Sequence, residues 1–183
     1  MNETNAKIAI NGYQIRESIK RFILQRDAAA AAFKESLFAF EGEEKDGPEK
    51  VMSDFETADH NLARLEELQQ LYNQSILCNV LGQQISLSLC VKLVGGAGRR
   101  EKMWRESAVG KKERYSYSDP VRERDNSKEY SKRTLSVKDC SDLSQKAAKY
   151  ASAIRNAIAR GNSTDVSVEK LNVTVEEYKS LFE

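Results

Sequence analysis

Two long segments of the chain carry apolar side chains at alternating spacings of three and four residues, which is the repeat of one face of an α-helix. In residues 15–40 the repeat consists of Ile15, Ile19, Phe22, Ala29 or Ala30, Phe33, Leu37 and Phe40. In residues 51–76 it consists of Val51, Phe55, Ala58, Leu62, Leu65, Gln69, Tyr72 and Ile76. When one segment is folded back on the other, the two faces match rung by rung. The pattern predicts a long antiparallel helical hairpin with coiled-coil-like packing.

A short charged connection, EGEEKDGPEK, separates the two segments. Gly42 and Gly47 favour a turn there, and Pro48 is well placed to open the second helix because proline suits the first helical position. A stalk of two helices buries only one stripe per helix. We therefore expect it to dock on further helices or on other copies of the chain.

The remaining sequence predicts smaller elements. Residues 78–85 indicate a turn or a small extended excursion around Gly82, after which Ser86 can cap a third helix that runs through Ala108. Alternating polar and apolar residues predict a β-hairpin at about residues 113–137, with its turn near Asp125.

Two capping patterns begin the last helices. Ser136 with Asp139 predicts the start of a fourth helix that continues to Gly161, and Thr174 with Glu177 predicts the start of a short terminal helix. The expected fold is thus mainly α. We expect a helical body over residues 1–162 with the β-hairpin inserted in it, and a linker with a C-terminal docking helix over residues 163–183.

Composition narrows the class of protein. Two prolines and nine glycines leave little material for the turns of a β-sandwich or barrel. The three cysteines are far apart and include no Cys-x-x-Cys pair, so neither a disulfide framework nor a zinc site is indicated. The sequence shows no signal peptide and no membrane span. We therefore expect a cytoplasmic protein, in a bacterium or in the host of a virus, with no membrane partner.

The charge is divided unevenly along the chain. The formal net charge is +1, but residues 99–138 hold 13 basic and 7 acidic residues, which gives +6. Residues 1–98 hold 10 basic and 14 acidic residues, and residues 139–183 hold 6 and 7, so these flanks carry −4 and −1. A surface that attracts anions is therefore expected in the middle segment.

The tract GGAGRREKMWR, residues 95–105, is the best candidate binding site within that segment. Glycines let a ligand or another backbone approach closely, and exposed amides together with arginines can bind phosphate oxygens. The tract matches neither a P-loop nor Gly-x-Gly-x-x-Gly. Close helix packing or a helix break explains the glycines about as well as contact with a ligand does. The candidate ligand-binding residues are Gly95, Gly96, Gly98, Arg99, Arg100, Trp104, Arg105, Arg114, Tyr115, Tyr117 and Arg133.

This mixture of cations and flat rings suits a nucleotide, because guanidinium groups bind phosphate and an aromatic face stacks on a base. Seven interspersed acidic residues argue against long nucleic acid, which favours a denser basic stripe. A solvated hairpin with charges of both signs explains the segment equally well.

Residues typical of catalysis do not form a recognisable arrangement. The single histidine, His60, lies on the second predicted helix and has no nucleophile or metal ligand at a diagnostic spacing. Glu43, Glu44, Asp46 and Glu49 lack the alternate spacing of a calcium loop. We expect a non-enzymatic protein with no cofactor and no metal.

The order of elements resembles a family of small uncharacterised helical bacterial proteins labelled septicolysin-like. The residues that carry the resemblance are Gly42-Glu43-Glu44 with Pro48, the tract LEELQQLYN at residues 65–73, Arg114-Tyr115-Ser116, and residues 134–137. The resemblance covers roughly residues 13–162. It implies the helical fold and oligomerisation, and it implies no activity.

Together these observations predict a homo-oligomer that holds a nucleotide-like phosphorylated small molecule between residues 95–100 and the hairpin. Sequestration of such a molecule, as by a viral anti-defence protein that acts as a sponge, needs close complementarity and no catalytic groups. The alternative hypothesis is a structural or interaction scaffold whose basic segment binds an acidic protein partner.

Overall fold

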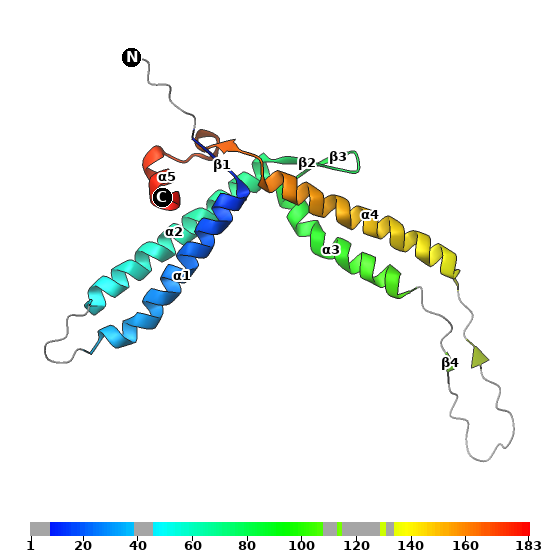
Figure 1. Ribbon diagram of the computed structural model, residues 1–183, viewed down its shortest axis with the longest axis horizontal. Coiled ribbons are helices and arrows are strands. Elements are labelled where there is room, and N and C mark those ends of the chain that lie inside the picture. The colour runs from blue at the N-terminus through cyan, green and yellow to red at the C-terminus, as the bar shows by residue number, and fades with distance from the viewer. Residues whose placement is uncertain (1–7, 39–45, 108–112, 115–128, 131–133) are drawn as a thin grey trace, which may run out of the picture. The chain divides into compact units, whose positions relative to one another are not determined.

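A computed structural model of the chain describes residues 8–38, 46–107, 113–114, 129–130 and 134–183, and it is mainly helical (Figure 1). The chain forms two compact units. The first combines residues 1–90 with residues 157–183, and the second is formed by residues 91–156. The second unit is thus inserted in the sequence of the first. Among the described helices, none has the length and apolar character needed to cross a membrane.

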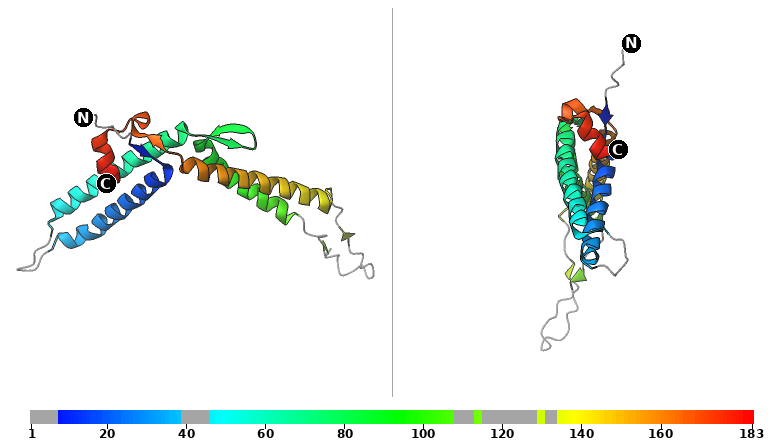
Figure 2. Two further views of the ribbon diagram at one scale, coloured as in Figure 1. Left: turned by 45° about the horizontal axis from the view of Figure 1, so that its top comes forward. Right: turned by 90° about the vertical axis from the view of Figure 1, so that its left-hand side faces the viewer.

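The first unit is built on an antiparallel pair of long helices, α1 (Gly12–Ser36) and α2 (Pro48–Ser75), which lie side by side (Figure 2). Asn11 caps α1: its side chain accepts hydrogen bonds from the amides of Tyr13 and Gln14, both at 3.1 Å. Pro48 occupies the first turn of α2, as the sequence predicts. The predicted helical hairpin is confirmed.

The seam between α1 and α2 follows the predicted repeat closely near its base and less well toward its far end. Ile15, Phe22, Leu62, Leu65 and Tyr72 are buried. The buried positions differ from the predicted repeat in two places. Leu68 is fully buried where the repeat predicts Gln69, because α2 turns this position toward the core formed with the C-terminal segment. At the far end Leu37 is 53% exposed and Ala30 is exposed, so the seam does not close there.

Three short antiparallel strand pairs accompany the helices. β1 (Ala9–Ile10) pairs with β6 (Val166–Ser167), so the segment just before α1 is joined to a segment close to residue 167. β2 (Leu77–Val80) pairs with β3 (Gln83–Ser86) around Gly82, as predicted for this region. β4 (Glu113–Arg114) pairs with β5 (Glu129–Tyr130), at the place of the predicted β-hairpin. The predicted turn near Asp125 lies outside the described residues.

The remaining helices begin where their caps predict. α3 (Leu87–Glu106) is followed by α4 (Val137–Asn162), where the Asp139 amide donates to Ser136 Oγ at 3.0 Å. A 3-10 helix, η1 (Val168–Leu171), replaces part of the predicted linker, and α5 (Val175–Phe182) has the predicted capping box of Thr174 with Glu177. α5 packs against α1 in the first unit.

The tyrosine hydroxyl at the base of the hairpin connects α2 to the end of α4. Tyr72 is fully buried, and its hydroxyl lies 2.7 Å from the carbonyl of Gly161 and 2.6 Å from that of Thr164. Burial raises the pKa of the Tyr72 phenol, so the hydroxyl keeps its proton for donation. The packing is tight here, because a Cβ on Gly12 would lie 2.6 Å from the side-chain oxygen of Asn162.

We expect Tyr72→Phe to lower the free energy of unfolding by about 1–3 kcal/mol, because buried carbonyl groups lose their donor. Urea unfolding followed by circular dichroism measures this value. Tyr13→Phe is the matched control: its hydroxyl contacts the Ala159 carbonyl at 3.4 Å, but Tyr13 is 46% exposed. An equal effect of both substitutions would contradict a central role for Tyr72.

Candidate functional site

The glycine tract lies inside a helix. α3 is continuous from Leu87 to Glu106, so Gly95, Gly96 and Gly98 neither break it nor form a loop. Amides in a helix interior donate to carbonyls four residues earlier. The expectation that these amides are exposed to a phosphate is therefore wrong, and any anion bound here must be held by side chains.

At the glycines, no side chain covers the backbone of α3. A Cβ on Gly96 would meet nothing within 4 Å, and a Cβ on Gly98 would come no closer than 3.9 Å to the Arg155 guanidinium. A Cβ on Gly95 would lie 3.6 Å from Nη1 of Arg99, so the arginine folds back over the bare backbone. Close packing against another described helix therefore does not explain Gly95 and Gly96.

The cations on α3 differ in what they contact. Arg99 is exposed and has no ion-pair partner among the described residues. The Arg100 guanidinium lies over the ring of Tyr150 on α4, 5.4 Å from its centre. Arg105 is different, because it lies 4.0 Å from the Glu101 carboxylate, which also pairs with Arg155 at 3.3 Å. Only part of the predicted cation cluster is thus available to an anion.

The structure brings together some of the predicted site residues. Trp104 is half-buried on the same helix as Arg99 and Arg100. Arg114 is in β4, and its side chain is not among those described. Tyr115, Tyr117 and Arg133 lie outside the described residues. Their predicted part in a ligand site therefore stays a prediction.

A hollow lies between α1 and α2 toward the far end of the hairpin. It has a volume of about 200 Å³, and we call it the apolar hollow. Its lining consists of Ala29, Ala30, Phe33, Val51, Met52 and Phe55. Ala29 and Ala30 belong to the run of five alanines at residues 28–32, and their single methyl groups are too short to fill the space between the helices. The run also favours a helix, because alanine has the highest helix propensity.

A second hollow of the same hairpin, about 550 Å³, shares Ala29 and Val51 with the apolar hollow and adds the carboxylates of Asp46 and Asp54. Acidic side chains dominate this end of the hairpin. Residues 24–38 and 46–60 together hold seven acidic and three basic residues, which gives a charge of −4. The hairpin therefore combines apolar lining with a negative rim.

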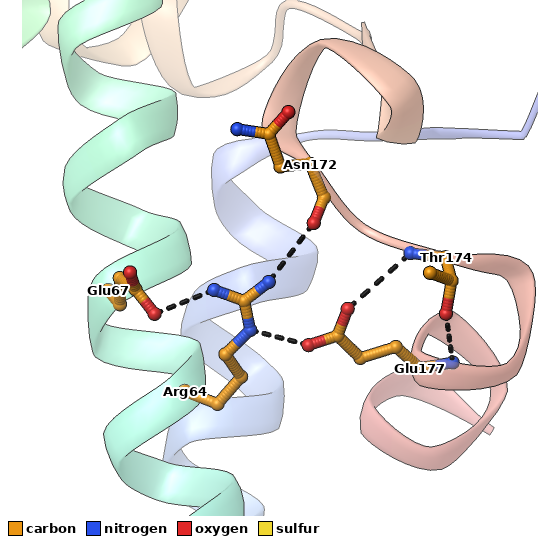
Figure 3. Close-up of polar contacts among 5 residues, drawn as sticks. All are labelled: Arg64, Glu67, Asn172, Thr174 and Glu177. Atoms are coloured by element: carbon orange, nitrogen blue, oxygen red, sulfur yellow. Dashed lines mark hydrogen bonds and ion pairs between the residues drawn. The ribbon is translucent and has the colours of Figure 1, made fainter.

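The C-terminal helix is held on α2 by a cluster around Arg64 (Figure 3). The Arg64 guanidinium donates to Glu177, to Glu67 at 2.6 Å and to the carbonyl of Asn172 at 3.1 Å. Glu177 also closes the capping box with Thr174. The hydrogen bond that Arg64 donates to Glu177 lowers the pKa of the Glu177 carboxyl and raises the pKa of the Arg64 guanidinium. Arg64 and Glu177 are 113 residues apart, so no local spacing in the sequence pairs them.

A third cavity, about 260 Å³, lies between α1 and α5. Arg21 in its lining donates to the Leu181 carbonyl at 2.8 Å, and its Nε is buried without an acceptor. Glu17 also lines the cavity and forms an ion pair with Lys20 at 2.7 Å. A positive charge near the C-terminus of a helix is favourable, so the hydrogen bond from Arg21 to Leu181 stabilises the packing of α5 on α1.

Cys78 and Cys90 are buried and are poorly suited to act as nucleophiles. Burial raises the pKa of the Cys90 thiol to about 11, so it is not a thiolate near neutral pH. Cys78 is buried and directs its sulfur toward the Ala157 carbonyl, 3.6 Å away. His60 is exposed on α2. In the part of the chain that the structure describes, no three His, Cys, Asp or Glu side chains gather as a metal site.

No family model, curated protein or solved structure matches this chain. The resemblance to septicolysin-like proteins therefore stays a prediction. Function must be inferred from the hollows and the charged surfaces of the chain itself.

The Arg64–Glu177 pair generates a pH prediction. Because the pKa of Glu177 is lowered in the folded chain, its stabilising effect is full above the unfolded-state pKa of about 4.3 and is lost as the pH falls through the folded value. We expect Glu177→Gln to lower the free energy of unfolding at pH 7 and to have a much smaller effect at pH 3. Urea unfolding at both values measures the difference.

Glu176→Gln is the matched control, because Glu176 is an exposed neighbour in the same turn. Its effect should be small at both pH values. A Glu177→Gln effect that is the same at pH 3 and pH 7 would contradict the role of the ion pair.

Proposed function

We propose that this chain is a non-enzymatic, self-associating interaction protein that holds a basic amphipathic helix of a partner protein against its α1–α2 hairpin. The observation that carries the proposal is the apolar hollow beside a negatively charged rim. Phe33, Val51 and Phe55 supply apolar contact there, and Asp46 and Asp54 supply charge.

Size and shape support a helix as the occupant. Grooves that bind helices take apolar side chains spaced three and four residues apart, and they leave the polar face of the ligand in water. A hollow of about 200 Å³ suits one large apolar side chain from such a helix. The charge of −4 around it favours Lys and Arg on the flanks of that helix and speeds association.

Self-association is the second part of the proposal. Several large apolar side chains of the hairpin are exposed, including Leu24 at 70% and Phe38 at 77%. Two helices cannot cover each other on all sides, so contacts with other copies would remove this surface from water.

Photocrosslinking tests the partner site. With p-benzoylphenylalanine in place of Met52, we expect crosslinks to peptides of an amphipathic helix with net positive charge, identified by mass spectrometry. Ala30→Arg should reduce the yield at least tenfold, because the arginine side chain fills the apolar hollow. Ala31→Arg is the matched control, because Ala31 is exposed and does not line the hollow. Equal yields in both variants, or crosslinks to acidic segments, would contradict the proposal.

A second candidate function is the binding of a nucleotide-like phosphorylated small molecule on α3. Arg99 favours it, because this arginine has no ion-pair partner among the described residues and lies over the bare surface at Gly95. Arg100 is already held against Tyr150, so it would lose little freedom on binding. An acidic protein partner, as in the scaffold hypothesis, would use the same cations.

Thermal unfolding with a panel of mononucleotides, cyclic nucleotides and nucleotide sugars tests this candidate. A ligand present at 100 times its Kd stabilises the folded state by about 2.7 kcal/mol, so the midpoint should rise by several degrees. Arg99→Ala should abolish the rise. Arg105→Ala is the matched control, because Arg105 already lies beside Glu101. A panel without any rise in midpoint would exclude this candidate for the compounds tested.

A further inference from the structure

A long stretch of the chain carries no charge at all. Residues 68–91 contain no Asp, Glu, Lys, Arg or His, although 31% of all residues are charged. Burial explains part of this stretch, since Leu68 and Tyr72 are in the core. It does not explain the β2–β3 hairpin, where Leu77, Asn79, Leu81, Gln83 and Gln84 are exposed.

The hairpin presents open strand edges. β2 and β3 form a two-stranded sheet, and no other described strand pairs with either of them. The loop between Val80 and Gln83 has two residues, so Val80 and Gln83 exchange the first hydrogen bonds of the ladder. In the next pair, the backbone N–H and C=O groups of Asn79 and Gln84 point away from the partner strand, toward the open edges of the sheet. Natural proteins usually guard such edges with charged residues or proline. This hairpin has neither.

The tip of the hairpin holds an apolar residue in a costly conformation. Leu81 has φ 50° and Gly82 has φ 91°, so both are left-handed. Glycine and asparagine suit such positions, whereas leucine is disfavoured because its Cβ crowds the backbone. Leu81 is nevertheless 56% exposed, and Leu77 on the same hairpin is 71% exposed. Folding of the single chain does not benefit from a leucine at this point.

An uncharged edge is suited to pairing with itself. In a two-fold symmetric contact the same residues meet, so a charge would repel its own copy. Glutamine avoids this repulsion, since its side-chain amide both donates and accepts and can therefore bond to another glutamine. β3 carries two such residues, Gln83 and Gln84.

We infer that the β2–β3 hairpin is the surface through which two copies of this chain associate. β3 of one copy pairs antiparallel with β3 of the other near Gln84, and Leu81 of each copy packs against the partner hairpin. The inference rests on the proposed self-association and assigns its surface.

Charge substitutions at one position test this inference by sedimentation velocity. The wild-type chain should sediment as a dimer, and Gln84→Lys and Gln84→Glu should each raise the dimer dissociation constant at least tenfold, because like charges then face each other. Mixing the two variants should restore association, since Lys then faces Glu. Gln70→Lys, on the exposed face of α2, adds the same charge away from the hairpin and should leave the dimer intact.

Leu81→Asn gives a second, independent readout. Asparagine tolerates the left-handed conformation, so the thermal midpoint of the isolated chain should rise while dimerisation weakens. A leucine with only a structural role would give a lower midpoint.

The outcomes separate the two proposals. A wild-type chain that stays monomeric at all concentrations would overturn self-association itself. A wild-type dimer that persists in both Gln84 variants would overturn only the assignment to the hairpin, because the copies would then meet elsewhere.

Discussion

The buried hydroxyl of Tyr72 is the contact on which the first unit depends. It connects α2 to the carbonyls of Gly161 and Thr164, so a helix from the first half of the chain is fixed to the segment that follows α4. The absence of a side chain on Gly12 allows α1 to enter the same junction beside Asn162. β1 and β6 pair next to this junction and η1 follows β6, while the Arg64 cluster holds α5 on α2. Without this junction the hairpin would remain two helices with a single buried stripe.

Much of the fold could be predicted from the sequence because its signals are local. The three-and-four repeat determines the α1–α2 hairpin, and Pro48, Ser136 and Thr174 mark helix starts through interactions within one turn. The β1–β6 pairing was not predicted. Its strands have two residues each and are far apart in sequence, so no period could reveal them. The same holds for Arg64 and Glu177, whose pairing depends on the route of the chain after α4.

The candidate sites show a different limit of sequence reasoning. Glycines at residues 95–98 indicated a helix break or a close contact, but α3 stays helical there, and a Cβ on Gly96 would meet nothing within 4 Å. Conversely, the alanine run at residues 28–32 favours a helix, but its sequence does not show that Ala29 and Ala30 border a hollow between two helices. A residue type indicates its own secondary-structure preference, whereas a hollow between two helices depends also on the side chains of the facing helix. The absence of charge from residues 68–91 can be read from the sequence, but only the structure shows that the β2–β3 part of this run is exposed.

The pairing of β1 with β6 bears on how the chain folds as it leaves the ribosome. The α1–α2 hairpin contains only local contacts, so it can form early in synthesis. The first unit cannot be completed then, because its remaining part, residues 157–183, is translated only after the whole of the second unit. Until residues 157–183 have been translated, the side of α2 that contains Leu68 and Tyr72 stays exposed to solvent. The nascent chain therefore exposes apolar surface until residues 157–183 have been translated, and this is the interval in which a chaperone would bind it.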